Sequence, residues 1–186
     1  MSTTAASICD FGQKAIDFDL LGIDGNTHSL ASVKGEKGTM VMFICNHCPY
    51  VRSIADRLAE DMKAFQNQGI GVIAIMSNDA NEYPEDSFEN MKRFSEKHNF
   101  SFPYVIDETQ KIGRAYDAKC TPDFFGYNAN LELQYRGRLD NSGASQPKPE
   151  SKHELLDAME QVIRTQKGPT EQIQSIGCSI KWRNSI

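Results

Sequence analysis

The sequence contains no long hydrophobic run and no cationic segment at its start. No stretch reaches the roughly 18 apolar residues that a transmembrane helix requires. Positions 1–12 are small and polar, and they lack the charged and apolar regions of a secretory signal peptide. We therefore expect no membrane partner and a cytoplasmic location.

Basic residues are not in excess. The chain has 20 Lys and Arg against 25 Asp and Glu, and the two signs are interspersed. No basic stripe is present to bind a phosphate backbone, so nucleic acid is not an expected partner. With 39% hydrophobic and 24% charged residues, the composition is that of a globular protein. At 186 residues, we expect one domain over residues 1–186, with a tail of about residues 168–186 docked on it.

Cysteine is scarce, with five residues at Cys9, Cys45, Cys48, Cys120 and Cys178. In a reducing compartment a framework of structural disulfides is not expected, so a close pair of cysteines is a candidate for redox chemistry or metal binding. The odd number also leaves at least one thiol outside any intramolecular pair.

Strand-like and helix-like segments alternate along the chain. The expected strands are Phe18–Leu21, Thr27–Leu30, Thr39–Ile44, Ile70–Met76, Tyr104–Ile106, Asp123–Tyr127 and Leu131–Gly137. The expected helices cover Asn46–Asn67, the region of Phe88–His98, Lys111–Tyr116 and Ser151–Gln166. This order predicts an α/β protein in which a central mixed β-sheet is flanked by helices, with an N-terminal β-hairpin and a C-terminal tail.

The sequence Cys45-Asn46-His47-Cys48 directly follows the nearly continuous apolar run of Thr39–Ile44. Two residues between cysteines allow a disulfide to form and reopen with little backbone movement. With the helix expected from Asn46, the helix dipole favours a thiolate at the first cysteine. We therefore expect Cys45 to attack, Cys48 to resolve the mixed disulfide from the first helical turn, and His47 to tune the Cys45 thiolate.

Four segments resemble the thioredoxin-like, peroxiredoxin-like branch of the redoxin (AhpC/TSA) superfamily. They are Gly12–Phe18, Phe43–Val51 with its CNHCPYV motif, Cys120–Phe125 and Gly177–Trp182. The resemblance implies a thioredoxin-like fold over nearly the whole chain. It also implies that Thr121-Pro122 is a cis-proline turn facing the dithiol, with the backbone of Thr121 presented to a bound substrate chain.

Two departures from related families bear on the chemistry. Aligning the Pro-x-x-x-Thr/Ser-x-x-Cys signature of peroxiredoxins on Cys48 puts Cys45 at the hydroxyl position and Val41 at the proline position. This mismatch disfavours a peroxidase. Thioredoxins also tend to carry a buried acid on the strand before the dithiol, but Thr39–Ile44 contains none, so no proton acceptor is assigned.

Two further cysteines have open roles. Cys120 is either a third thiol of the centre or a small buried residue. Cys178 belongs to a segment that either docks the terminus or returns an additional resolving thiol to the dithiol.

These features predict a thiol-disulfide oxidoreductase that needs no bound cofactor. Its expected partners are a protein or small-molecule disulfide, or a peroxide, and an external reductant such as a thioredoxin or glutathione system. One alternative is a thiol peroxidase. Another is a zinc or Cu(I) binding module built from Cys45, His47 and Cys48 with Cys120 or Cys178, although a single C-x-x-C pair argues against it and no metal site is assigned. A third is a catalytically silent redoxin domain.

Overall fold

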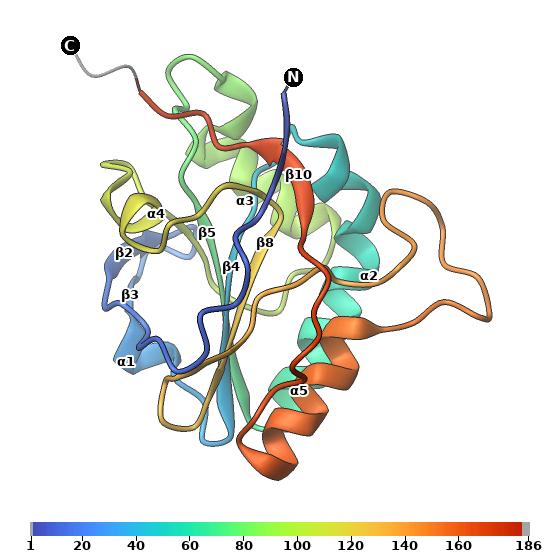
Figure 1. The fold of residues 1–186 in the computed structure, drawn as a ribbon. Helices are drawn as coiled ribbons and strands as arrows, with labels where there is room; N and C mark the ends of the chain where they lie inside the picture. Colours follow the sequence, from blue (N-terminus) through green and yellow to red (C-terminus); the bar gives the residue numbers. More distant parts are fainter. Residues whose placement is uncertain (1, 184–186) are drawn as a thin grey trace.

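The computed structural model describes residues 2–183. Its strands are β1 (Thr3–Ala5), β2 (Asp19–Gly22), β3 (Thr27–Ser29), β4 (Gly38–Phe43), β5 (Ile70–Met76), β6 (Tyr104–Ile106), β7 (Cys120–Thr121), β8 (Asp123–Asn128), β9 (Leu133–Tyr135) and β10 (Ile176–Ser179). Its helices are α1 (Leu30–Val33), α2 (Pro49–Asn67), α3 (Phe88–Lys97), α4 (Lys111–Ala115) and α5 (Glu154–Thr165), with the short 3-10 helix η1 (Pro84–Asp86) before α3 (Figure 1).

The larger sheet is built around β4. Its strand order is β3-β2-β6-β5-β4-β8-β9, and β4 pairs in parallel with β5 and antiparallel with β8. Every residue of β4 is buried, which is why this strand reads as an almost continuous apolar run. The dithiol follows this strand directly, so it starts from a fully buried part of the sheet.

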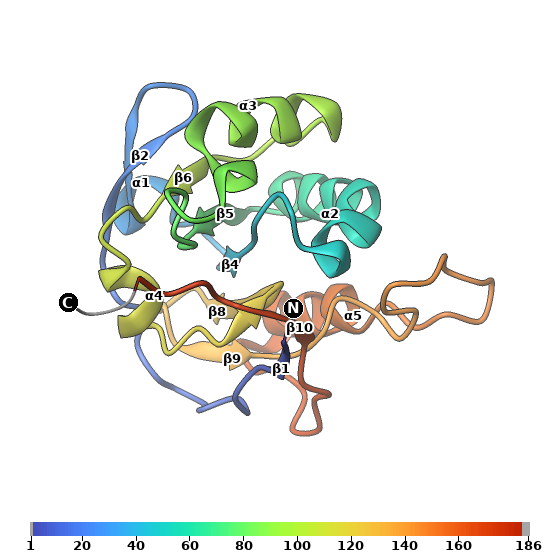
Figure 2. The same ribbon diagram turned by 90° about the horizontal axis from the view of Figure 1, so that it is seen from above.

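Alternating residues of β4 face two separate cores. Met40 and Met42 pack into a cluster with α2, α3 and α5, whereas Val41 and Phe43 pack into a second cluster. Seen from above, α2, α3 and α5 cover one face of the sheet and α1 and α4 lie on the other (Figure 2). The predicted mixed sheet with helices on both faces is confirmed, and so is the N-terminal hairpin, formed by β2 and β3.

A second, three-stranded sheet has the order β1-β10-β7 and joins the two ends of the described chain. These strands are two to four residues long. They were not predicted, because such short strands carry too few residues to show an alternating pattern. Residues 184–186 of the expected tail lie outside the described residues, and the extent of a single domain over residues 1–186 stays a prediction.

The dithiol helix begins later than predicted. The expected start was Asn46, but α2 begins at Pro49 and Cys48 is its N-cap residue, with an extended backbone at φ −66° and ψ 121°. The reason is Pro49, because proline suits the first helical position and disfavours helical geometry in the residue before it. Cys48, and not Cys45, is therefore the cysteine at the start of the helix.

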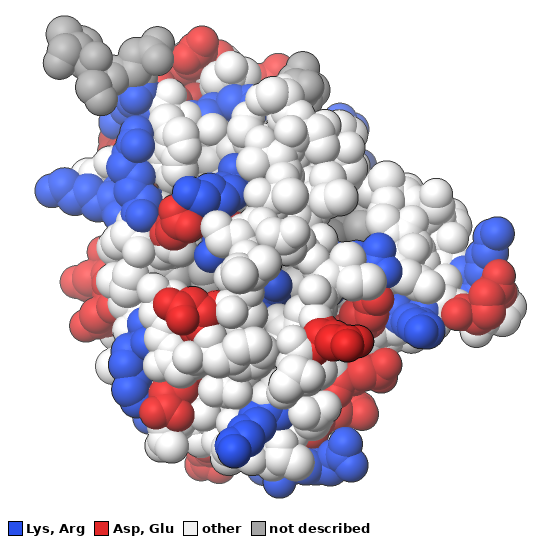
Figure 3. All heavy atoms as spheres, in the orientation of Figure 1, with Lys and Arg blue, Asp and Glu red and all other residues white. Residues whose placement is uncertain are grey.

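The face of the molecule shown in Figure 3 carries acidic and basic side chains side by side over much of its area. The surface around β10 and the start of α2 consists mainly of uncharged residues in that view. Two exposed isoleucines, Ile173 and Ile176, belong to this region and are each 53% exposed. Among the described residues, no helix combines the length and the apolar character that crossing a membrane requires.

Candidate active site

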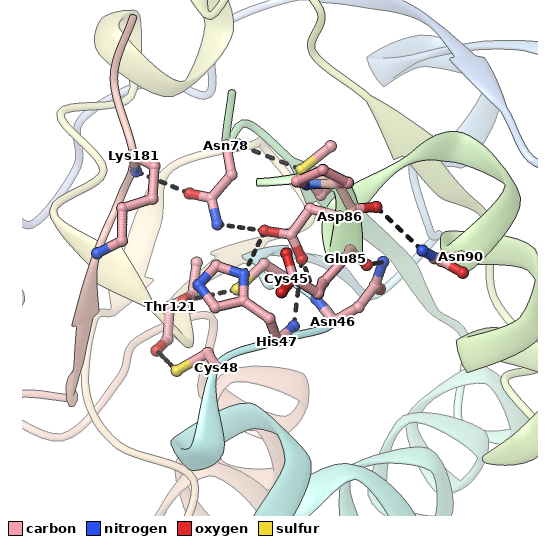
Figure 4. Close-up of polar contacts among 12 residues, drawn as sticks. Cys45, Asn46, His47, Cys48, Asn78, Glu85, Asp86, Asn90, Thr121 and Lys181 are labelled. Atoms are coloured by element: carbon pink, nitrogen blue, oxygen red, sulfur yellow. Dashed lines mark hydrogen bonds and ion pairs between the residues drawn. The ribbon is translucent and has the colours of Figure 1, made fainter. Parts of the chain in front are cut away.

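The two cysteines of the C-x-x-C sequence lie beneath the surface. Cys45 is 1% exposed and Cys48 is fully buried. Both are thiols in this structure. Asn46 and His47 form a bend between the end of β4 and the N-cap of α2, so the two cysteines flank this bend (Figure 4).

Thr121 contacts both sulfur atoms. Its Oγ1 lies 3.3 Å from the Sγ of Cys45, and its carbonyl oxygen accepts a hydrogen bond from the Sγ of Cys48 at 3.1 Å (Figure 4). The peptide bond from Thr121 to Pro122 is cis, as the resemblance implied. The structure therefore brings Cys45, Cys48 and Thr121 together, although Thr121 comes from a strand more than 70 positions away.

A buried acid that sequence reasoning missed completes the centre. Asp86 ends η1, is 0% exposed, and accepts the backbone N–H groups of Asn46 at 2.8 Å and His47 at 3.2 Å. It also accepts the side-chain N–H groups of His47 (Nδ1) at 2.6 Å and Asn78 (Nδ2) at 2.7 Å. Four N–H groups on two oxygens make an environment suited to a carboxylate.

Asp86 determines the state of His47. The hydrogen bond from His47 Nδ1 to Asp86 raises the pKa of the imidazole above its ordinary value, while burial opposes this rise. The ring is stacked on Tyr83, with centroids 5.4 Å apart and planes 10° apart. Its other nitrogen, Nε2, is buried and has no hydrogen-bond partner. One side-chain atom each of Cys45, His47 and Asp86 lies within 4.8 Å of the others, so the imidazole is near the Cys45 thiol.

The environment of Cys48 favours a thiolate. A hydrogen bond from Cys45 lowers the pKa of the Cys48 thiol to about 5, with further support from Cys178 and from the backbone amide of Val51. Burial opposes this shift, and so does the bond that the protonated thiol donates to the Thr121 carbonyl. The groups that donate hydrogen bonds to the Cys48 sulfur outnumber the one acceptor, the Thr121 carbonyl. The positive end of the 19-residue helix α2 also stabilises the thiolate.

The environment of Cys45 favours the protonated thiol. Its hydrogen bond to Cys48, its burial and the nearby charge of Asp86 all raise the pKa of the Cys45 thiol well above its ordinary value. The expectation that Cys45 is the thiolate is therefore not supported by the electrostatics of the centre. The physical reason is the late start of α2, which gives the helix N-terminus to Cys48.

The order of the strands could have indicated that the loop containing Asp86 lies near the dithiol. Loops that follow adjacent parallel strands meet at the carboxyl edge of a sheet. Because β5 lies next to β4 in parallel, the loop of residues 77–86 is bound to approach the C-x-x-C bend. Nothing in the local sequence distinguishes Asp86 from the other acids of that loop, however. Asn78 is fixed in turn, because its Oδ1 accepts the backbone N–H of Lys181 at 2.8 Å.

The other two candidate cysteines occupy different positions. Cys178 is the register partner of Thr121 in the pairing of β10 with β7. Cys120 is the preceding residue of β7, and its Sγ lies 3.5 Å from the carbonyl oxygen of Pro122. Because successive side chains of a strand point to opposite faces, Thr121 faces the dithiol and Cys120 points away from it. The structure thus brings Cys178 to the centre and leaves Cys120 as a buried thiol whose pKa burial raises strongly.

The pairing of β10 also changes the role implied for Thr121. The resemblance implied that its backbone faces a bound substrate chain. In this structure the chain's own β10 takes that place, because Cys178 pairs with Thr121 and Ser179 pairs with Cys120. A substrate chain cannot pair with Thr121 along this edge while β10 occupies it.

A cavity of about 310 Å³ lies beside Pro122. Its walls include Tyr50 and Ile54 from α2 and Ile176 from β10. The charged groups of its rim are paired, Arg138 with Glu154 and Asp140 with Arg57. The cavity therefore offers a mostly apolar binding surface beside the cis Thr121-Pro122 turn.

Cys45, His47 and Asp86 also have the residue types of a metal site. Zinc and Cu(I) bind sulfur and imidazole ligands, and zinc sites usually have four ligands in all. The Asp86 carboxylate already accepts four N–H groups, and metal binding would compete with them. The donor set therefore fits a hydrogen-bonded redox centre better than a preformed metal cage.

Comparison with known proteins agrees with this geometry. A family model described as the AhpC/TSA family matches residues 11–141. The thiol-disulfide oxidoreductase ResA of Halalkalibacterium halodurans is 26% identical over 127 residues, which is 68% of each chain. The peroxiredoxin Bcp of Bacillus subtilis is 27% identical over 108 residues, which is 58% of this chain and 64% of that protein. The chain thus matches about two-thirds of the length of these curated relatives.

One solved structure shows the same fold over the whole chain, and another shows it over part of the chain. An uncharacterized conserved protein from Geobacillus kaustophilus superposes with a TM-score of 0.94 at 40% identity, over 100% of this chain and 99% of that one. A secreted disulfide oxidoreductase of Mycobacterium tuberculosis has a TM-score of 0.54 at 20% identity, over 63% of this chain and 80% of that one, which is a likeness of fold alone.

The family match includes β4, the C-x-x-C bend, Asp86 and the Thr121-Pro122 turn. It covers well over half of the chain, and the structure has the mixed sheet and flanking helices of a thioredoxin-like fold. The predicted family and fold are therefore confirmed: this chain belongs to the AhpC/TSA family.

Proposed function

We propose that this protein is a thiol-disulfide oxidoreductase in which Cys48 is the attacking thiolate and Cys45 is the resolving thiol. The observation that carries the proposal is the position of Cys48 as the N-cap residue of α2, where the helix N-terminus favours a thiolate, whereas Cys45 lies before the bend, beside Thr121 Oγ1. This is the reverse of the order expected from the sequence. The reaction requires no bound cofactor, because two thiols supply both electrons.

In the first step the Cys48 thiolate attacks one sulfur of a substrate disulfide. A bond forms between Cys48 Sγ and that sulfur, the substrate S–S bond breaks, and the second substrate sulfur leaves as a thiolate. The lowered pKa of Cys48 keeps the attacking group ionised at neutral pH. The product of this step is a mixed disulfide on Cys48.

In the second step Cys45 attacks the sulfur of Cys48. Cys45 must first lose its proton, because its pKa is raised. Neutral His47, held in place by Asp86, accepts that proton, and the resulting imidazolium is stabilised by the carboxylate. The Cys45–Cys48 disulfide forms and the first substrate sulfur leaves as a thiolate, which takes the proton from His47. The substrate has then gained two electrons and the protein has lost them.

This cycle requires two partners, a disulfide substrate and an external reductant. The apolar cavity beside Pro122 favours a disulfide with an uncharged, apolar group next to its sulfur. An external thiol reductant, of the kind that thioredoxin or glutathione systems provide, returns the protein to its dithiol form. A reducing compartment such as the cytoplasm suits that cycle.

The experiment is a stopped-flow comparison of wild type, Cys45→Ser and Cys48→Ser with bis(2-hydroxyethyl) disulfide. Wild type is expected to reduce the disulfide with turnover when an external dithiol is supplied. Cys48→Ser is not expected to turn over, and Cys45→Ser is expected to turn over more slowly than wild type. If the wild-type protein reacts with the disulfide no faster than free cysteine does, the proposed function is wrong.

Peroxide reduction is the second candidate, and one observation favours it. The thiolate-forming cysteine is Cys48, which is the position that aligns with the peroxidatic cysteine of peroxiredoxins, and one relative is a peroxiredoxin. Against it stand Val41 and Cys45 at the positions of the proline and hydroxyl residues of that signature. Oxidation of the reduced protein by hydrogen peroxide decides between the two, since a rate close to that of free cysteine excludes a peroxidase.

A further inference from the structure

Strand β10 covers the dithiol in a specific register. It pairs antiparallel with β7, and Cys178 lies directly opposite Thr121. Directly opposite residues of an antiparallel pair project from the same face, with Cβ atoms about 4.5–5.5 Å apart. The side chain of Thr121 faces the dithiol, since its Oγ1 lies 3.3 Å from the Sγ of Cys45. The side chain of Cys178 therefore faces the dithiol as well.

The packing of Cys178 agrees with this register. Its side chain is 3% exposed and belongs to the same buried cluster as Cys45 and Cys48. Thr121 O accepts from the Sγ of Cys48 at 3.1 Å, so the residue that Cys178 faces also contacts Cys48. A hydrogen bond between the Cys48 and Cys178 side chains contributes to the pKa of both thiols. Three sulfur atoms thus surround Thr121.

Strand β10 is also held tightly against this edge. A side chain at Gly177 would place its Cβ 2.0 Å from the carbonyl oxygen of Thr121, so only glycine allows this approach. On the far side β10 pairs with β1, where Cys178 is the register partner of Thr3. The position of Cys178 is therefore fixed from both neighbouring strands.

We propose that Cys178 is a third redox thiol of this centre, which resolves the mixed disulfide on Cys48 and forms a Cys48–Cys178 disulfide. Strand β10 pairs with the edge at Thr121 where a substrate strand would bind. Its Cys178 then takes the position of a substrate cysteine. This inference rests on the proposed function, because it requires Cys48 to react with a substrate disulfide first.

Resolution by Cys178 is a thiol-disulfide exchange in which electrons and protons balance. Cys178 Sγ forms a bond with Cys48 Sγ, the bond between Cys48 and the substrate sulfur breaks, and the substrate leaves as a thiolate that takes the proton released by Cys178. Cys45 then attacks Cys48 and releases Cys178 as a thiol, which moves the disulfide to Cys45–Cys48 without a net change in electrons. An external dithiol reduces either disulfide.

The acidity of Cys178 depends on the state of Cys48. Burial and the Cys48 neighbour raise the pKa of the Cys178 thiol to about 12, whereas Lys181 lowers it. When Cys48 is bound in a mixed disulfide its thiolate charge is gone, so this charge no longer raises the pKa of Cys178. Cys178 is then more acidic at the point in the cycle where it has to attack.

The test uses Cys45→Ser, which leaves Cys178 as the neighbouring thiol on the dithiol face. The reduced variant is treated with bis(2-hydroxyethyl) disulfide, the remaining thiols are alkylated with iodoacetamide, and the protein is digested with trypsin without reduction. Cleavage after Lys and Arg separates the relevant cysteines into peptides 38–52, 120–136 and 168–181. Mass spectrometry then identifies which peptides are joined.

The expected result is a 38–52/168–181 disulfide, with Cys120 alkylated in peptide 120–136. In the double variant Cys45→Ser/Cys178→Ser, the mixed disulfide with 2-mercaptoethanol is expected to persist on Cys48. If Cys45→Ser already retains that mixed disulfide while Cys178 is alkylated, Cys178 is not a resolving thiol and the proposed function still holds. If Cys48 is alkylated in both variants, it did not react, and the proposed function fails together with this inference.

Discussion

His47 Nδ1 and Asp86 Oδ2 lie 2.6 Å apart although 39 positions separate these residues in the chain. The contact joins the loop after β4 to the loop after β5, and it gives the dithiol a buried carboxylate that the strand before it lacks. Because Asp86 also accepts the backbone N–H groups of Asn46 and His47, it fixes both the shape of the C-x-x-C bend and the protonation of its histidine.

Asp86→Asn is expected to shift the pH dependence of the resolving step. Asp86 raises the pKa of His47 by stabilising the imidazolium, so loss of its charge lowers that pKa. Since Cys45 deprotonation requires neutral His47, the rate of the second step rises with pH through the His47 pKa. In Asp86→Asn this rise moves to lower pH. His47→Ala removes the base, and we expect the step to slow by roughly 10²-fold or more.

A matched control for this prediction is Asp56→Asn. His98 Nδ1 and Asp56 Oδ1 are also 2.6 Å apart, but this pair lies on the surface. Its loss is expected to leave the pH profile unchanged. An NMR titration of the imidazole resonances reports the His47 pKa directly. An unaltered His47 titration in Asp86→Asn contradicts the role assigned to Asp86.

Cys45→Ala is expected to raise the pKa of Cys48. The hydrogen bond from Cys45 is the largest contribution that lowers this pKa, and alanine cannot donate one. Cys45→Ser retains a hydroxyl donor and is expected to raise the pKa less. The measurement is the rate of iodoacetamide alkylation against pH, with peptide mapping of Cys48. Cys120→Ala serves as the control, because Cys120 points away from the dithiol. Identical Cys48 profiles in wild type and Cys45→Ala would show that Cys45 does not stabilise the thiolate.

Thr121→Val is expected to slow the resolving step without changing the alkylation of Cys48. Valine keeps the shape of threonine and the backbone carbonyl that Cys48 contacts, but it removes the Oγ1 that lowers the pKa of Cys45. Loss of a hydrogen bond worth about 1 kcal/mol corresponds to a rate decrease of about fivefold. The decay of the mixed disulfide on Cys48, followed in a Cys178→Ser background, measures this rate. Thr27→Val, on exposed strand β3, provides the control.

Gly177→Ala is expected to displace β10 from β7. The added Cβ would lie 2.0 Å from the Thr121 carbonyl oxygen, and that clash is with backbone rather than with a movable side chain. We expect a destabilisation of about 1–3 kcal/mol, measured by urea unfolding, together with faster alkylation of Cys178. Ser179→Ala alters the same strand without a backbone clash and is expected to change the alkylation of Cys178 little. Equal Cys178 reactivity in wild type and Gly177→Ala contradicts the close docking of β10.

The sequence was sufficient where a pattern extends over many residues. The apolar run of β4 and the helical stripe of α2 predicted the strand-to-helix junction that carries the dithiol. The exact helix start was missed, because the effect of Pro49 on Cys48 outweighed the apolar period that extended the helix to Asn46. The carboxylate of Asp86 and the register of Cys178 opposite Thr121 are long-range contacts, and their local sequences carry no periodic signal.

In the proposed order of reaction, Cys48, at the N-cap of α2, attacks first and Cys45 resolves. The test traps the first mixed disulfide at pH 7 with one equivalent of bis(2-hydroxyethyl) disulfide in Cys45→Ser and Cys48→Ser, each made in a Cys178→Ser background. Cys45→Ser is expected to gain one 2-mercaptoethanol adduct on Cys48 rapidly, whereas Cys48→Ser is expected to gain it on Cys45 slowly. Rapid adduct formation on Cys45 in Cys48→Ser, with Cys48 unreactive in Cys45→Ser, would contradict this order.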